Sequence, residues 1–188
     1  TFPPADDMEA YDLLIGLQDK LEEGNCTRRF LAEVRQVVRW YSGHNFSLVR
    51  MVAAEMMSDV GQRRVCHEWL ALLKDEDWTV RASACSSLAN RGVDRCESVL
   101  EESLIGDPIH VVRSYAGCAL MQVAGPSRLP FIAEQCEKER VLEAKLPWLC
   151  LLVDTGFLES DTRARSQIRI FEKRPTQRHK DITESSRE

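Results

Sequence analysis

The sequence is poor in the features that mark several large classes of protein. Aromatic residues make up 7% of its 188 residues, and there are nine glycines and seven prolines, which excludes collagen-like and low-complexity chains. No run reaches the roughly 18 to 20 apolar residues of a membrane span. No basic leader followed by an apolar stretch is present either. We therefore expect a cytoplasmic protein with no membrane partner.

The cysteines do not form a disulfide or zinc-binding pattern. There are seven of them, an odd number, and no two have the two-residue spacing of a zinc or redox site. Secreted proteins rarely carry this many without an even set of disulfides. We expect reduced thiols that serve mostly as small buried side chains, notably Cys85, Cys96, Cys118 and Cys136.

Motifs for catalysis and for cofactor binding are also missing. The sequence has no glycine-rich phosphate loop, no nucleophile elbow and no metalloprotease helix. Cys66 and His67 are neighbours, and neighbouring helical side chains point about 100° apart, so the two cannot form a dyad. The four histidines are scattered. We therefore expect no metal, no cofactor and no catalytic residues, and we favour a protein that is not an enzyme.

What the sequence does contain is a repeat. Val-Arg pairs occur at Val49-Arg50, Val80-Arg81 and Val112-Arg113, at spacings of 31 and 32 residues. Small residues follow each pair, and a glycine closes each copy about twelve residues on, where a helix end favours it. Weaker copies lie at either end. The hairpin loops are therefore predicted at Gly24, Gly61, Gly92 and Gly125, and the last copy closes at Gly156.

Apolar residues within each copy recur at helical spacing. Val80, Ala84 and Leu88 share one helix face, and a second stripe follows Gly92. No run alternates as a half-buried strand would. The chain is therefore predicted to be all-α, with Leu88 and Leu120 in its core.

The turns sharpen the pattern, because Asp75 and Asp107 each lie six residues before the arginine of a Val-Arg pair. An aspartate-rich turn, Val-Arg, small residues, leucine and glycine together resemble the HEAT repeat, particularly the short form of phycobilisome-lyase-like proteins. The resemblance covers about residues 44–156 and, more loosely, 8–43. It implies a right-handed α-solenoid of about four to five helical hairpins in residues 1–159. Ile109 and Lys145 depart from the pattern.

Residues 160–188 differ from the repeats. Between 160 and 180 there are seven bases and two acids, with a small apolar cluster that cannot form a core. We expect a basic carboxy-terminal tail that is partly flexible, with a short helix or an extended segment at about 162–172.

The recurring arginines have two possible roles. Arg50, Arg81 and Arg113 could form a stripe that binds phosphates or carboxylates. Alternatively, each could pair with a turn aspartate within or between repeats and satisfy groups at helix ends. We favour the second role.

Charge is uneven along the chain, with a net charge of -6 in residues 1–24 and +4 in 28–50. In the HEAT fold the second helix of each pair lines the concave surface, which the resemblance places at 28–42, 62–74, 94–105 and 127–139. A solvated charged face is the alternative. The predicted partner-binding residues on these helices are Arg35, Arg39, Arg63, Arg64, His67, Glu97, Glu101, Glu102 and Glu134.

From this groove we predict a scaffold, adaptor or inhibitor that binds another protein with a mixed or acidic surface. The resemblance leaves enzymes as the alternative, either bilin-lyase-like or a base-excision DNA glycosylase that holds a base against tryptophans. Nucleic acid is not the expected partner, because the net charge is -5 and phosphate contacts need a basic face. His67-Glu68 is a single copy of a pair that HEAT-repeat iron hydroxylases repeat, and one pair cannot build a dinuclear site.

Overall fold

The computed structural model describes residues 6–60, 65–90, 96–158, 165–166 and 168–169. Within these residues there are helices and no strand, which confirms the all-α prediction. The helices are α1 (Asp7–Glu22), α2 (Arg28–Tyr41), α3 (Ser47–Asp59), α4 (His67–Leu72), α5 (Trp78–Asn90), α6 (Glu97–Gly106), α7 (His110–Ala124), the 3-10 helix η1 (Gly125–Arg128), α8 (Leu129–Lys138) and α9 (Leu142–Asp154).

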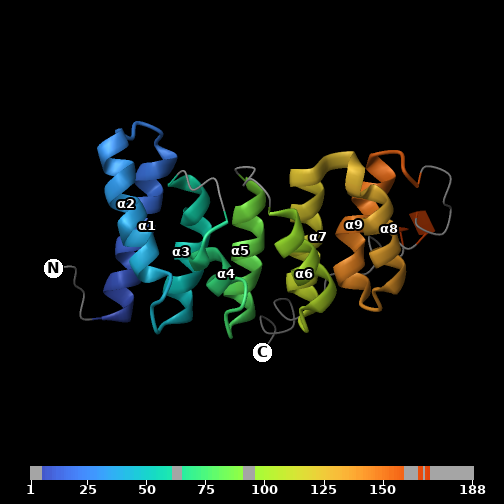
Figure 1. Ribbon diagram of the computed structural model, residues 1–188, viewed down its shortest axis with the longest axis horizontal. Coiled ribbons are helices and arrows are strands. Elements are labelled where there is room, and N and C mark those ends of the chain that lie inside the picture. Colours follow the sequence, from blue (N-terminus) through green and yellow to red (C-terminus); the bar gives the residue numbers. More distant parts are fainter. Residues whose placement is uncertain (1–5, 61–64, 91–95, 159–164, 167, 170–188) are drawn as a thin grey trace, which may run out of the picture.

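The odd-numbered helices form a continuous layer. Each of α1, α3, α5 and α7 contacts the next odd-numbered helix, and the series follows the long axis of the molecule (Figure 1). The even-numbered helices pack mainly on the odd-numbered helix that follows them. The closest pairs are therefore joined by the turns before α3, α5, α7 and α9, two of which contain the predicted aspartates, Asp75 and Asp107. This corrects the predicted unit, in which a glycine separates the two helices of a pair.

Glycines end several of the helices. Gly24, Gly125 and Gly156 have φ angles of 78°, 60° and 75°, a region that side chains with a Cβ rarely adopt. Each follows a helix, as the repeat predicted. Gly61 and Gly92, the other two predicted loop positions, lie outside the described residues.

Helix α2 shows how the sequence produces an element and its buried face. Thr27 accepts a hydrogen bond from the Phe30 backbone N–H and so caps the helix. Val34, Val37, Val38 and Tyr41 follow at spacings of three and four residues, and all four are buried. Of the arginines that the charge pattern singled out on this helix, Arg35 is half-buried and Arg39 is exposed.

The core runs between the two layers. Leu88 and Leu120 are fully buried, which confirms their predicted position. Trp69 and Trp148 are the largest fully buried side chains. The indole N–H of Trp69 donates to Ser87 Oγ at 3.0 Å, so burying this aromatic residue leaves no polar atom unsatisfied.

All seven cysteines lie among the described residues and are reduced thiols. Cys85, Cys96 and Cys136 are buried as predicted, whereas Cys118 is half-buried. Burial raises the pKa of Cys85 to about 12 and that of Cys136 to about 11. These thiols therefore act as apolar core groups and are not ionised near neutral pH.

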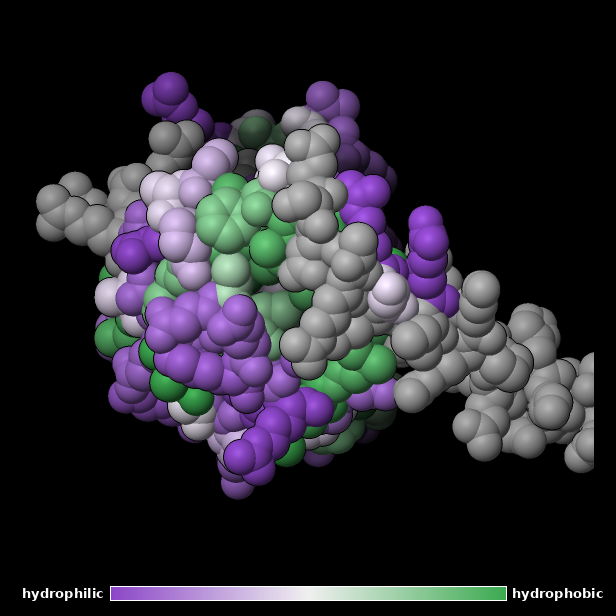
Figure 2. Space-filling view, turned by 90° about the vertical axis from the view of Figure 1, so that its right-hand side faces the viewer, coloured by the Kyte–Doolittle hydropathy of each residue, from purple (hydrophilic) through white to green (hydrophobic). Residues whose placement is uncertain are grey.

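The carboxy-terminal end of the stack carries the last contacts with the core. Leu158 and Ile168 pack against it. Residues 165–166 and 168–169 are helical, in the stretch where a short helix or an extended segment was expected. Apolar and strongly hydrophilic residues lie side by side on this end face (Figure 2). The rest of the predicted tail lies outside the described residues. No helix of the described chain is long and apolar enough to span a bilayer.

Candidate functional site

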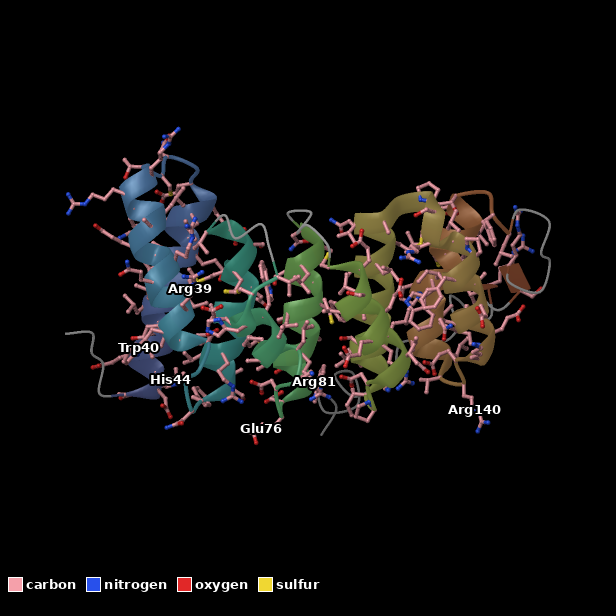
Figure 3. The ribbon with its side chains drawn as sticks, in the orientation of Figure 1. Arg39, Trp40, His44, Glu76, Arg81 and Arg140 are labelled. Carbon is pink, nitrogen blue, oxygen red and sulfur yellow. The ribbon has the colours of Figure 1, made fainter. Side chains whose placement is uncertain are left out.

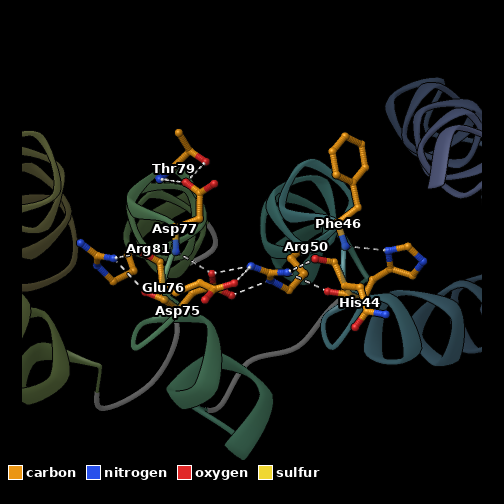
Figure 4. Close-up of polar contacts among 9 residues, drawn as sticks. His44, Phe46, Arg50, Asp75, Glu76, Asp77, Thr79 and Arg81 are labelled. Carbon is orange, nitrogen blue, oxygen red and sulfur yellow. Dashed lines mark hydrogen bonds and ion pairs between the residues drawn. The ribbon is translucent and has the colours of Figure 1, made fainter.

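Arg50 connects two successive turns. Its Nε and Nη2 atoms donate to the two carboxylate oxygens of Asp75 at 2.7 and 2.8 Å. Its Nη1 atom donates to the backbone carbonyls of His44 and Asn45, each at 2.8 Å. The guanidinium therefore joins the turn before its own helix α3 to the turn before α5 (Figure 4).

The same arrangement recurs along the molecule. Arg81 binds Asp107 at 2.7 and 3.1 Å, and Arg113 binds Glu139 at 2.7 and 3.0 Å. Each arginine also donates to two carbonyls of the turn before its helix. Figure 3 shows that Arg81 lies at the same edge of the molecule as other turn residues. The prediction that the arginines pair within and between repeats is confirmed.

The paired carboxylates also shape their own turns. Asp75 accepts from the Asp77 backbone N–H, Asp107 from that of Ile109, and Glu139 from that of Val141. The hydrogen bond to its carboxylate raises the pKa of each arginine. Because the guanidinium donors are already engaged and largely buried, these arginines do not form a stripe for an external phosphate.

The first turn of the series has a different residue at the position of the carboxylate. His44 Nδ1 accepts from the Phe46 backbone N–H at 3.2 Å, as Asp75 does for Asp77. Its Nε2 lies 3.8 Å from a carboxylate oxygen of Asp7 on α1. A histidine thus performs the local turn-forming task of the aspartate, a substitution that the sequence pattern did not reveal.

A groove of about 940 Å³ lies on the odd-numbered layer. Helix α5 contributes small side chains to it, among them Ala82, Ser83 and Ser86, which recur at the three- and four-residue spacing of one helix face. Trp78 on α5 and Tyr115 on α7 also line the groove, and 43% and 48% of their surfaces are exposed. Helices α1 and α3 complete the lining.

The charged residues of this lining are all acidic. They are Glu22 on α1 and Glu55 and Asp59 on α3, and the described lining includes no lysine, arginine or histidine. Glu55 accepts a hydrogen bond from Ser83 Oγ at 3.0 Å, which fixes its carboxylate across the α3–α5 boundary. The groove therefore combines a negative wall with two exposed aromatic rings.

Arg35 and Arg39, two of the four arginines predicted to line a groove, lie outside this one. Arg35 donates twice to the carbonyl of Val60, at 3.1 and 2.6 Å. Arg39 lies 3.3 Å from Glu68, near Trp40 in Figure 3. Arg63 and Arg64 fall outside the described residues. The helical spacing could not show that Arg35 would tie α2 to the end of α3.

The other predicted residues are on α4, α6 and α8. His67 is exposed, with its Nδ1 atom 3.4 Å from Glu68, so Arg39 and His67, both described members of the predicted set, converge on that carboxylate. Glu101 lies 3.0 Å from Arg128. Glu97 and Glu102 lie on α6 and Glu134 on α8, the last paired with Lys138.

None of the described members of this predicted set lines this groove, although Glu102 lines a second hollow of about 380 Å³ with residues of α4 and α6. That the second helices line the concave surface stays a prediction. The groove is lined by the helices that contain the Val-Arg pairs and small residues, because their short side chains leave a hollow between stacked helices. The sequence places Ala82, Ser83 and Ser86 outside the Val80, Ala84 and Leu88 face, but it does not show whether this second face lines a groove or is buried. That the predicted residues bind a partner stays a prediction.

The described residues do not assemble a metal centre, and Cys66 is not activated as a nucleophile. No group of three or more histidine, cysteine, aspartate or glutamate side chains among them could hold a metal ion. Burial, followed by a hydrogen bond with Glu68, raises the pKa of Cys66. A thiol with a raised pKa is a poor nucleophile at neutral pH.

Comparison with known proteins finds similarity in the repeated part of the chain. No curated protein and no solved structure matches the chain. Residues 67–145 match the family model of HEAT repeats. This stretch contains α4 to α8 and the start of α9, with the Arg81–Asp107 and Arg113–Glu139 pairs. Over these residues, the chain is similar to HEAT repeats.

Proposed function

We propose that this protein is a non-catalytic interaction module, a scaffold, adaptor or inhibitor, whose groove on the odd-numbered layer binds a segment of another protein. The observation that carries the proposal is the 940 Å³ groove lined by α1, α3, α5 and α7. HEAT repeats commonly mediate protein–protein contacts, and stacked helical repeats create extended binding surfaces. The repeat pattern supports a right-handed solenoid of four to five hairpins, of the short phycobilisome-lyase-like form.

The dimensions of the groove suit an extended chain. Packed helices lie about 8 to 10 Å apart, so a groove across four successive helices spans on the order of 25 to 30 Å. An extended peptide rises about 3.3 Å per residue, and roughly eight residues would fill that length. Trp78 and Tyr115 supply exposed aromatic surface of the kind that is enriched at interfaces.

The tryptophans and the charge weigh against the glycosylase alternative. Trp69 and Trp148 are buried in the core, so they cannot hold a base. Trp78 is exposed in the groove, but the charged residues of the described groove lining are acidic and would repel phosphates. These observations support a protein ligand.

Filling the groove tests the proposal. Ser86 lies in the groove on α5, and Ser86→Trp would place an indole in the space that a partner needs. Ser98 is exposed on α6, and Ser98→Trp is the matched control on the other layer. Both variants should keep the helical circular dichroism spectrum and the melting temperature of the original chain.

We expect a partner captured from the native cell by the original chain to be retained by Ser98→Trp and lost with Ser86→Trp. Retention by a folded Ser86→Trp variant would contradict the groove as the binding site. Loss with Ser98→Trp alone would instead favour the predicted residues that neighbour it on α6, Glu97, Glu101 and Glu102.

A further inference from the structure

We propose that the molecule has a further binding surface, a hollow that accepts an apolar side chain of a partner protein together with an adjacent carboxylate. This hollow has a volume of about 300 Å³ and lies between the carboxy-terminal ends of α6 and α8, beside the turn before α9. Its described lining shares no residue with that of the groove on the odd-numbered layer. The inference therefore goes beyond the proposed function and does not rest on it.

Apolar side chains form the floor and the rim of this hollow. Leu104 and Trp148 line it with only 3% and 1% of their surfaces exposed, which places them at the floor. At the rim, Ile105 is exposed over 61% of its surface and Val141 is half-buried. Covering exposed apolar surface is favourable by about 25 cal/mol per Å². The hollow therefore favours a ligand with an apolar side chain.

The charged residues of the described lining are mostly basic. They are Arg113, Lys138 and Arg140, against the single acid Glu139. Arg113 binds Glu139 at 2.7 and 3.0 Å, so these two charges neutralise each other. Lys138 pairs with Glu134 on the surface. The charge that remains for a ligand is that of Arg140.

Arg140 is well placed to meet an anionic group. It is exposed, and its side chain makes no ion pair or hydrogen bond to the described part of the chain. In Figure 3 it extends from the edge formed by the turns. All the elements that form the hollow belong to residues 96–158, which are described without a gap. A guanidinium binds a carboxylate through two parallel hydrogen bonds.

Other ligands match this combination less well. A basic segment would bring a like charge to Arg140 and Lys138, which opposes binding. A free phosphate would pair with Arg140 but leave Ile105 and Val141 uncovered. Residues 160–180 of this chain are strongly basic and so have the wrong sign. An apolar residue beside an aspartate or glutamate of another protein satisfies both parts of the hollow, and its charge agrees with the acidic partner surface that the sequence predicts.

Titration of the full chain with short glycine-serine peptides, followed by nuclear magnetic resonance, tests the proposal. The probe peptide contains one leucine between two glutamates. In one comparison peptide lysines replace the glutamates, and in the other serine replaces the leucine. We expect the probe to shift the amide signals of Ile105 and Val141, and the comparison peptides to bind at least about fivefold more weakly. If either comparison peptide binds as tightly as the probe, the proposal is overturned.

Two pairs of variants locate the site. Arg140→Gln should weaken binding of the probe about threefold, whereas Arg29→Gln, at a position on α2 whose side chain is 90% exposed, should leave it unchanged. Ile105→Ser should weaken binding about tenfold. Its control is Leu70→Ser, because Leu70 is 41% exposed and lines the 380 Å³ hollow on the other side of α6. Equal loss within either pair would overturn this hollow as the site.

The remaining outcomes identify the occupant. Self-association of the original chain that Ile105→Ser abolishes would show that a second copy fills the hollow, and would overturn an external partner. Ser86→Trp changes the groove and no residue of this hollow, so it should bind the probe as the original chain does. Loss of probe binding in a folded Ser86→Trp variant would place the peptide in the groove and overturn the proposal.

Discussion

At the scale of single residues, the arginine of each Val-Arg pair is a structural connector. Arg81 makes two hydrogen bonds to the carboxylate of Asp107 and two to carbonyls of its own turn. A guanidinium can do this because its five N–H donors lie in one plane, whereas a lysine ammonium cannot make the bidentate contact. Glu139 replaces aspartate in the last pair and keeps the bidentate geometry.

The first prediction concerns this pair. Arg81→Gln should destabilise the fold by about 3 kcal/mol, because it leaves the carboxylate of Asp107, only 6% exposed, without its cation. Urea unfolding followed by circular dichroism measures the change.

Arg29→Gln is the control for that prediction. Arg29 forms an ion pair with Glu33 on the surface of α2, with 90% and 61% of the two side chains exposed. Such a pair contributes about 0.5 kcal/mol or less. If the two variants unfold at the same urea concentration, the inter-repeat pair does not have the structural role assigned to it.

At the scale of elements, the packing of α7 against α9 depends on a residue without a side chain. A Cβ at Gly117 would overlap the indole of Trp148. The indole N–H of Trp148 donates to the Ser114 carbonyl at 3.1 Å, so the ring lies directly on the backbone of α7. Glycine is unfavourable within a helix, and here the close approach of the tryptophan explains its presence.

The second prediction follows from this contact. Gly117→Ala should lower the free energy of unfolding by about 1 to 3 kcal/mol, the usual effect of overpacking a core. Gly16 in α1 offers the matched control, because a Cβ there would meet nothing within 4 Å. Gly16→Ala should raise stability by about 0.5 to 1 kcal/mol through helix propensity alone. We expect the melting temperature to fall in Gly117→Ala and to rise in Gly16→Ala. A higher melting temperature in both variants would exclude the tight α7–α9 contact.

At the scale of the whole molecule, neighbouring units are joined by helix stacking and by ion pairs between residues 25 or 26 positions apart. The stack is therefore sensitive to protonation of the acidic residues. Burial acts to raise the pKa of Glu139, but hydrogen bonds from Arg113 and the Val141 backbone lower it overall. Hydrogen bonds from Thr79 lower the pKa of Asp77.

The third prediction concerns stability in acid. A carboxylate with a lowered pKa in the folded state stabilises the fold above its ordinary pKa, and this contribution is lost as the pH falls through the lower folded value. The melting temperature should therefore change little between about pH 5 and 7 and fall below about pH 4. Glu139→Gln should melt lower at neutral pH and lose less on acidification. A melting temperature that is constant down to about pH 2 would contradict this.

The sequence by itself determined the helices, the repeat and much of the core. Leu88 and Leu120 could be placed because a buried helix face recurs every three to four residues, and Gly24 and Gly125 because a left-handed helix end favours glycine. The pairing of Arg81 with a turn aspartate could be expected from their regular spacing. These features depend on the local geometry of a helix or on the regular spacing between successive copies of the repeat.

Only the tertiary structure decided which layer forms the groove and which charges face it. Each helix of a stack buries more than one face. The periodicity of the sequence therefore could not show whether the face of α5 with Ala82 and Ser83 lines a groove or packs against another helix. Arg35 reads as a solvated charge in the sequence, but its guanidinium binds the Val60 carbonyl. Glu55 and Tyr115 are 60 positions apart and line one groove because helix stacking, a long-range property, brings them to the same surface.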